Sequence, residues 1–149
     1  MRKLALLTVL LAWAPLGTAD NRLELDEYAG QVVVVDFWAS WCVPCRRSFP
    51  WMNAMQDRYQ DEGLRIIAVN LDRDSADAER FLAAYPHNFR IAYDPDGNVA
   101  KEYGVVGMPS SIVIGRDGQV FERHTGFKVR KQDNYEATLR AALGLEDRK

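Results

Sequence analysis

Two continuous apolar runs in the first half of the chain predict strands that are buried on both faces. The first covers residues 32–38, begins with four successive valines and contains one acid, Asp36. The second covers residues 66–71. β-Branched runs without polar alternation are typical of central strands that helices cover on both sides. A carboxyl group is costly to bury, so Asp36 is a candidate functional residue.

Helical spacing of apolar residues follows the first run. Such spacing after Cys45 predicts a helix that reaches about Tyr59. Asp133, followed three positions later by Glu136, resembles a capping box that opens a last helix. The other predicted helical segments cover residues 76–85 and, for one or two turns, 99–103.

Shorter segments complete the pattern. Strands are predicted over residues 89–93 and 111–114, and a tight turn at residues 116–118 leads into a strand at 119–121. The last two strands therefore form a hairpin. Strands that alternate with helices, then a hairpin and a final helix, predict an α/β fold. Its central mixed sheet has an antiparallel edge and helices on both faces.

The N-terminus follows a different pattern. Arg2 and Lys3 precede an almost wholly apolar run over residues 4–16, and small residues end it at positions 17–19. This order is typical of a secretory signal peptide. The run is shorter than the ~20 residues that span a bilayer, so an uncleaved membrane anchor is the less favoured alternative. We expect a signal peptide at residues 1–19, followed by one domain at residues 20–149 that is located in the periplasm.

Composition and charge exclude some function classes. The chain is 48% hydrophobic and 27% charged, which suits a globular domain of this length. Cleavage after Ala19 would leave 17 basic and 21 acidic residues, a net charge of −4. Because no basic stripe is present either, we expect no nucleic-acid partner.

The chain contains two cysteines, Cys42 and Cys45. Their spacing lets the two sulfur atoms meet across a single turn. The start of a helix offers unpaired N–H groups and the positive end of the helix dipole, and both favour thiolate over thiol. Thiols in such positions have pKa values of roughly 3.5 to 7.5, and the thiolate is the attacking species in disulfide exchange. The pattern therefore favours a redox-active pair.

A structural disulfide and a metal site are the alternatives. Closing so small a loop would stabilise the fold by only ~2 kcal/mol, which is little reason to keep cysteines there. Structural zinc needs four ligands, and His87 and His124 lie far from the pair in sequence. We therefore expect neither a metal nor another cofactor.

Several motifs resemble a known family. The segment DFWASWCVPC at residues 36–45 resembles the active-site segment of thioredoxins, and Pro50 falls where that family's helix is kinked. Gly107-Met108-Pro109 before a strand resembles the family's cis-proline loop. Residues 93–118 are closer to the exported TlpA/ResA/CcmG-type branch, which carries an additional strand and helix in mid-domain. The resemblance covers residues 28–144 approximately and implies a thioredoxin fold with this insert.

The motif suggests distinct roles for the cysteines and for the nearby acid. Cys42 is expected to be the attacking thiol, because it lies at the helix start and is the more exposed of the pair. Cys45 would resolve the mixed disulfide. Asp36 would serve as a general base that deprotonates Cys45, the alternative being a solvated acid at a strand end. Asp36 matches thioredoxin itself, since the TlpA-type branch usually has asparagine there.

The resemblance also implies a substrate-binding surface. A cis bond between Met108 and Pro109 would pack the proline against the sulfur atoms and present backbone polar groups to a substrate strand. Trp41 would form part of an exposed apolar rim that receives protein substrates, whereas Trp38 belongs to the core.

These features predict an exported thiol–disulfide oxidoreductase, and the branch resemblance favours a dithiol reductase of protein disulfides. It implies a membrane thiol electron donor of DsbD/CcdA type, and apocytochrome c or copper-site proteins as clients. A periplasmic disulfide oxidant and a non-enzymatic thiol metallochaperone stay open as alternatives, although copper-carrying relatives space their cysteines one residue wider. A peroxidase is disfavoured, because no Thr-x-x-Cys segment like that of the related peroxiredoxins is present. We expect a monomer.

The leader can be tested directly. Mass spectrometry of the protein expressed in a Gram-negative host should find a mature chain that starts at Asp20, in the periplasmic fraction. An intact Met1 terminus in the membrane fraction would identify the apolar run as an anchor instead.

Overall fold

A five-stranded sheet organises residues 23–146, the part of the chain that the computed structural model describes. The strand order is β3-β2-β1-β4-β5. β1 pairs in parallel with β2, which pairs in parallel with β3, and β4 pairs antiparallel with both β1 and β5. The mixed sheet and its terminal hairpin are therefore confirmed, with a last strand longer than predicted. The strands are β1 (Val32–Trp38), β2 (Leu64–Asn70), β3 (Arg90–Tyr93), β4 (Ser110–Ile114) and β5 (Val120–Thr125).

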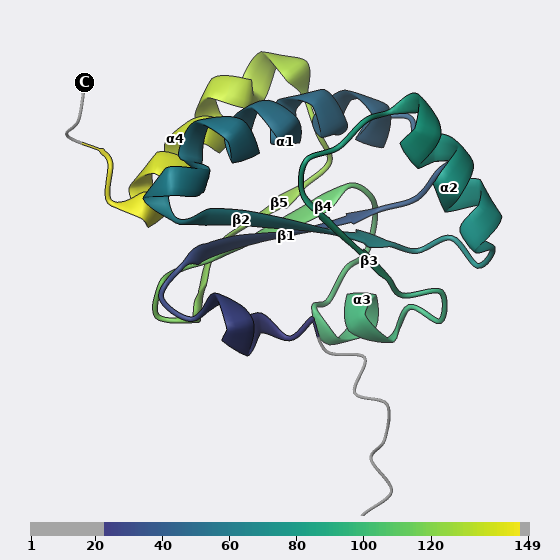
Figure 1. The fold of residues 1–149 in the computed structure, drawn as a ribbon, viewed down its shortest axis with the longest axis horizontal. Coiled ribbons are helices and arrows are strands. Elements are labelled where there is room, and N and C mark those ends of the chain that lie inside the picture. The colour runs from purple at the N-terminus through teal and green to yellow at the C-terminus, as the bar shows by residue number, and fades with distance from the viewer. Residues whose placement is uncertain (1–22, 147–149) are drawn as a thin grey trace, which may run out of the picture.

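Helices cover both faces of the sheet, as predicted (Figure 1). Figure 1 shows α1, α2 and α4 on one face and α3 with the short helix η1, drawn in purple, on the other. β3 and α3 lie between α2 and β4 in the chain, where the strand-helix insert was expected. The helices are α1 (Cys45–Tyr59), α2 (Ser75–Ala84), α3 (Asn98–Glu102) and α4 (Gln132–Leu143), with 3-10 turns η1 (Leu25–Tyr28), η2 (Gln60–Glu62) and η3 (Val129–Lys131).

The predicted signal peptide, with its cleavage site after Ala19, lies outside the described residues. Among the helices of residues 23–146, none is long and apolar enough to cross a membrane.

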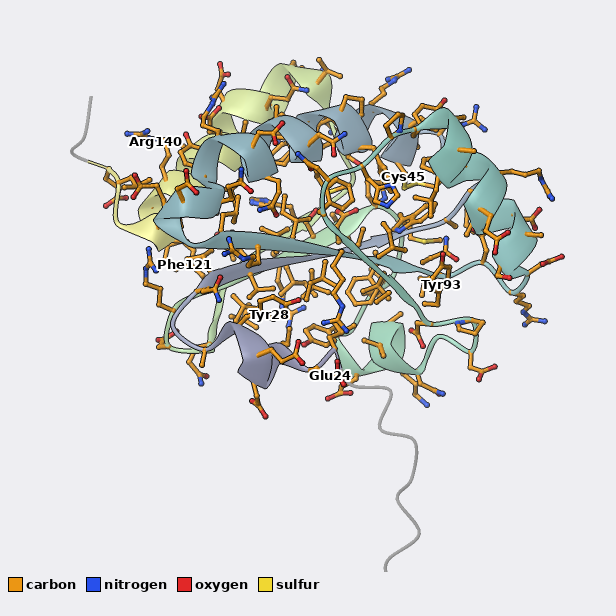
Figure 2. The ribbon with its side chains drawn as sticks, in the orientation of Figure 1. Glu24, Tyr28, Cys45, Tyr93, Phe121 and Arg140 are labelled. Carbon is orange, nitrogen blue, oxygen red and sulfur yellow. A yellow bond between two sulfur atoms is a disulfide. The ribbon has the colours of Figure 1, made fainter. Side chains whose placement is uncertain are left out.

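β1 is the centre of the packing, because all seven of its residues are buried. Its side chains alternate between two apolar cores, one on each face (Figure 2). On the face of α1 and α2, the ring of Trp38 lies 4.9 Å from that of Phe49 and 4.7 Å from that of Phe81. On the opposite face, Phe37 lies 5.8 Å from the ring of Tyr103. Trp38 is thus a core residue, as predicted, and β1 is held from both sides.

The predicted capping box of the last helix is wrong. α4 begins at Gln132, and its N-cap residue, Lys131, makes no side-chain capping bond. Glu136 turns toward α1 instead, where its Oε1 accepts hydrogen bonds from Arg58 Nη1 at 2.6 Å and from the Tyr59 hydroxyl at 2.5 Å. The local motif fails because this glutamate links two helices that are distant in sequence.

Two other helix ends have residues that are typical of helix caps. Asp74 is the N-cap of α2, and its carboxylate accepts a hydrogen bond from the Ala76 N–H at 2.9 Å. Gly144 ends α4 in the left-handed conformation, with φ of 73°, which is typical of a glycine C-cap.

Candidate active site

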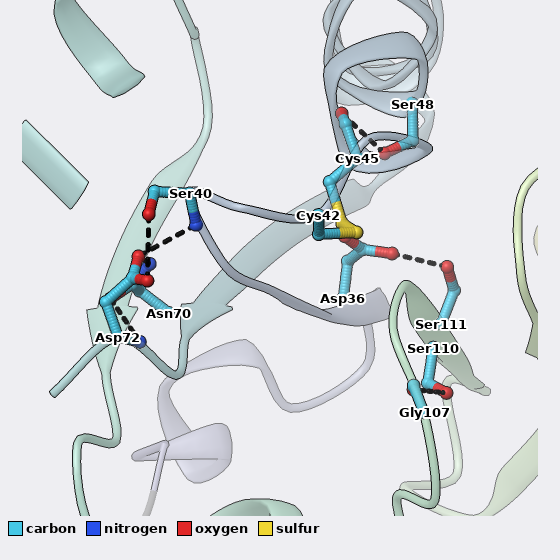
Figure 3. The surroundings of a disulfide bond; sticks show 10 residues. All are labelled: Asp36, Ser40, Cys42, Cys45, Ser48, Asn70, Asp72, Gly107, Ser110 and Ser111. Atoms are coloured by element: carbon cyan, nitrogen blue, oxygen red, sulfur yellow. Dashed lines mark hydrogen bonds between the residues drawn. A yellow bond between two sulfur atoms is a disulfide. The ribbon is translucent and has the colours of Figure 1, made fainter. Parts of the chain in front are cut away.

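A disulfide joins Cys42 and Cys45 in the turn that connects β1 to α1 (Figure 3). Their Cα atoms are 5.3 Å apart. The Cys45 N–H donates to the Cys42 carbonyl, and α1 begins at Cys45 with Pro44 as its N-cap residue. Cys42 is 4% exposed and Cys45 is fully buried. The expected bridge across a single turn is therefore present, and the slightly exposed residue of the pair is the one predicted to attack.

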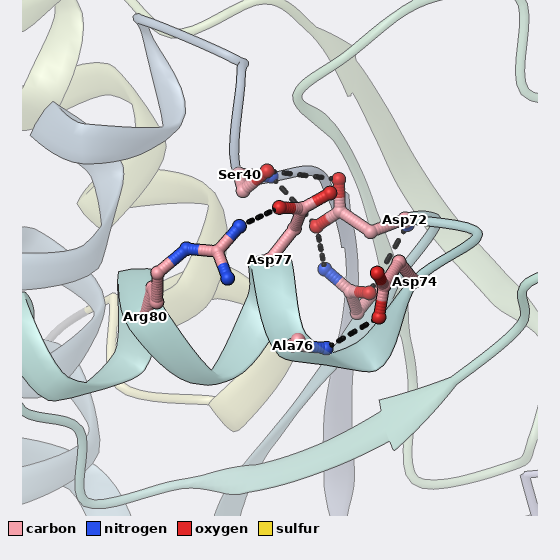
Figure 4. Close-up of polar contacts among 7 residues, drawn as sticks. Ser40, Asp72, Asp74, Ala76, Asp77 and Arg80 are labelled. Atoms are coloured by element: carbon pink, nitrogen blue, oxygen red, sulfur yellow. Dashed lines mark hydrogen bonds and ion pairs between the residues drawn. The ribbon is translucent and has the colours of Figure 1, made fainter.

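A buried polar network anchors the loop that leads to the disulfide (Figures 3 and 4). One oxygen of Asp72 accepts hydrogen bonds from the Ser40 N–H and from Asn70 Nδ2, both at 2.8 Å. The other oxygen accepts from the Ser40 hydroxyl at 2.9 Å. Asn70 is the last residue of β2, and its Oδ1 accepts from the Asp72 N–H at 3.0 Å. The loop after β1 is thus tied to the loop after β2.

Sequence reasoning missed this network, although a signal for it exists. Ser40 and Asp72 each follow the carboxyl end of a predicted buried strand. Because β1 and β2 are parallel neighbours, their carboxyl ends meet at the same edge of the sheet. Polar residues just after each strand are therefore expected to lie together.

Asp36 lies inside β1 beneath the disulfide, with only 1% of its surface exposed (Figure 3). Its Oδ1 accepts a hydrogen bond from the Ser111 hydroxyl at 2.5 Å. Its Oδ2 is buried and has no hydrogen-bond partner among the described residues. Burial raises the pKa of Asp36 from 3.8 to about 7, against the opposing effect of the Ser111 hydrogen bond. The buried position is confirmed, and a solvated acid at the strand end is excluded.

Apolar side chains are exposed in the turn that carries the cysteines and in the loop before β4. Trp41 is 67% exposed, as expected for a rim residue, and Val43 between the cysteines is 56% exposed. Val106, in the loop before Pro109, is 91% exposed. Sequence reasoning missed both valines, because neither the isolated Val43 nor the Val105-Val106 pair in a loop carries a periodic signal.

The loop before β4 contains a cis peptide bond between Met108 and Pro109, as the resemblance implied. The half-buried Met108 side chain packs against the core cluster that contains both cysteines. Within residues 23–146, the backbone N–H and C=O groups of Met108 make no hydrogen bond.

Within the same range, no group of three or more His, Cys, Asp and Glu side chains could hold a metal ion. His124 lies in β5, where its ring contacts that of Tyr135 in α4 at 5.1 Å.

A comparison with known protein families decides the relationship, since the Redoxin model matches residues 13–139. The chain belongs to the Redoxin family. It is 33% identical over 112 residues to the thiol-disulfide oxidoreductase ResA of Bacillus thuringiensis subsp. konkukian, covering 75% of this chain and 65% of that relative. ResA of Bacillus subtilis is 32% identical over 109 residues, or 73% of this chain and 61% of ResA. This Redoxin-family chain thus spans less than two thirds of the length of these curated relatives.

A solved structure gives a similar result. The Chlorobium tepidum protein assigned as a thiol:disulfide interchange protein, DsbE, is 49% identical, with a TM-score of 0.79. The match covers 80% of this chain and 85% of that one. These likenesses confirm the thioredoxin fold and the resemblance to the TlpA/ResA/CcmG-type branch.

The substitution Asp36→Asn should remove a pH dependence from the stability of the oxidised protein. Between the ordinary pKa of 3.8 and the folded value of about 7, the folded chain holds a proton that the unfolded chain has lost. Stability from this group is therefore fully present below pH 3.8, falls as the pH rises to about 7, and stays lost above it. At about pH 8 the variant should be more stable than the wild type by on the order of a few kcal/mol.

Urea unfolding of both proteins at about pH 5 and about pH 8 measures the difference in their free energies of unfolding, which should be larger at the higher pH. Asp96→Asn, in an exposed turn, serves as the control and should leave the pH dependence unchanged. An equal gap at both pH values would contradict the raised pKa of Asp36.

Proposed function

We propose that this protein is an exported thiol–disulfide oxidoreductase that reduces disulfides in client proteins. The observation that carries the proposal is the Cys42–Cys45 disulfide, in which Cys42 is slightly exposed and the adjacent Trp41 and Val43 are largely exposed and apolar. The backbone N–H and C=O of Met108, which make no hydrogen bond within residues 23–146, would pair with an extended client segment. Trp41 would contact apolar side chains of the same client.

The reaction begins with the reduced pair. The Cys42 thiolate attacks one sulfur of a client disulfide, the client S–S bond breaks, and the other client sulfur leaves and takes up a proton. Cys45 then gives its proton to Asp36 and attacks the sulfur of Cys42. The Cys42–Cys45 bond forms as the mixed disulfide breaks, and the second client sulfur leaves as a thiolate that takes up the proton held by Asp36. Two electrons have then passed from the protein to the client.

The same two sulfurs could run this exchange in either direction, so the direction is a separate part of the proposal. It rests on the TlpA/ResA/CcmG-type resemblance, whose exported members are kept reduced by a membrane thiol donor of DsbD/CcdA type. Cysteine pairs of apocytochrome c or of copper-site proteins are the clients we propose. We further propose that the protein works as a monomer in the periplasm.

The order of attack predicts which variant accumulates an intermediate. Cys45→Ser cannot complete the second step, so it should trap client proteins as mixed disulfides on Cys42. Cys42→Ser is the matched control and should trap none, because Cys45 is fully buried. Non-reducing electrophoresis after acid quenching measures the adducts. Trapping by Cys42→Ser alone would reverse the two roles.

The direction of electron flow predicts the potential of the pair. Titration against glutathione buffers should give a value on the reducing side, well below the roughly −120 mV of a strong oxidant such as DsbA. A potential near that of DsbA would indicate a protein that forms disulfides in its clients.

A further inference from the structure

Ser111 and Asp36 lie directly opposite each other in the antiparallel pairing of β1 and β4. Residues paired in this way project from the same face of the sheet. The Ser111 hydroxyl uses this position to donate its hydrogen bond to Asp36 Oδ1 at 2.5 Å (Figure 3). The two residues are 75 positions apart in the sequence, so the contact depends entirely on strand register.

This hydrogen bond makes the two carboxyl oxygens of Asp36 different. Rotation about the bond to an aspartate carboxyl group is soft, so an unattached carboxyl can present either oxygen over a broad range of angles. Here Oδ1 is bonded to Ser111, while Oδ2 is buried and has no partner among the described residues. Rotation to an intermediate angle would break the hydrogen bond and leave both buried oxygens unsatisfied, which is unfavourable, and a half-turn only exchanges the two equivalent oxygens.

We propose that Ser111 is a positioning residue of the resolving step: its hydroxyl fixes Oδ1 of Asp36 and keeps Oδ2 free to take the proton of Cys45. The inference rests on the proposed function, in which Cys45 resolves the mixed disulfide. The proton passes from the Cys45 sulfur to Oδ2, and the Cys45 thiolate then attacks Cys42. Ser111 keeps its own proton throughout and acts through Asp36.

The Ser111 hydroxyl donates to Asp36 and not to its other cross-strand neighbour, His124. His124 is the cross-strand neighbour of Ser111 on β5, but its Nε2 is buried without a hydrogen-bond partner in the described part of the chain. The ring of His124 packs against Tyr135 of α4. Burial is the largest influence on the pKa of His124 and lowers it below its ordinary value. The charge of Glu122 opposes this shift in pKa, and that of Lys131 adds to it. The imidazole is therefore neutral near pH 7.

The neighbouring serine provides a matched control. Ser110 lies opposite Phe37, on the other face of the sheet, and its hydroxyl donates to the Gly107 carbonyl at 2.6 Å. Ser110→Ala therefore removes a buried hydroxyl from the same strand without touching Asp36. Ser111→Thr keeps a hydroxyl at the functional position and tests for rescue.

Two measurements test the proposal on the full chain. The first is the NMR titration of the Asp36 carboxyl carbon in the oxidised protein, and the second is the pH profile of mixed-disulfide resolution in stopped-flow experiments with a disulfide-bonded model protein. Ser111→Ala should raise the carboxyl midpoint and move the rate profile to higher pH by about one unit, slowing resolution a few-fold near neutral pH. Ser110→Ala should move neither, and Ser111→Thr should restore both.

The double variant Asp36→Asn/Ser111→Ala completes a double-mutant cycle. It should resolve mixed disulfides at the same rate as Asp36→Asn, because a residue that acts through Asp36 has no effect once that carboxyl is gone. Three results would each overturn the proposal. The titration midpoint of Asp36 could be unchanged in Ser111→Ala, Ser110→Ala could shift it equally, or Asp36→Asn could resolve mixed disulfides at the wild-type rate. Failure of the proposed function looks different, since the wild-type protein would then neither form nor resolve mixed disulfides. The carboxyl titration needs no client and tests the Ser111–Asp36 contact in either case.

Discussion

The burial of β1 on both faces is the constraint on which the rest of this structure depends. Helices lie over each face of the sheet, so all seven residues of the strand are removed from water. Packing on both faces, together with the hydrogen-bonded pairing to β2 and β4, holds this strand in position and register. The turn that contains the disulfide follows directly from this strand, and it therefore starts from a rigid support.

The same burial gives Asp36 its chemical character. A carboxylate in an apolar layer has lost its hydration, and a single hydroxyl at one oxygen compensates only in part. The result is a carboxyl group with a pKa of about 7, which can accept and release a proton near neutral pH. The cost to stability at higher pH is typical of ionisable groups that are kept inside a protein for a reaction.

The two neighbours of β1 support the site in different ways. β2 and the loop after it contribute polar anchoring, because Asp72 accepts hydrogen bonds from the backbone N–H and hydroxyl of Ser40 and is itself bound by Asn70. β4 contributes the hydroxyl of Ser111 and is preceded by the cis-proline loop. One neighbour therefore holds the loop that carries the cysteines, while the other sets the environment of the buried acid and follows the loop that we propose binds the client.

The sequence by itself determined the elements and the disulfide-bonded pair, because these depend on local features. The valines of β1, the helical spacing after Cys45 and the two-cysteine turn all act over a few residues. The cis bond at Pro109 was implied only by family resemblance, since no periodic pattern reports it. Tertiary structure alone decided that Ser111 binds Asp36 and that Glu136 joins two helices instead of capping one. Both contacts join residues more than 70 positions apart, and the packing and register that bring them together are properties of the whole fold.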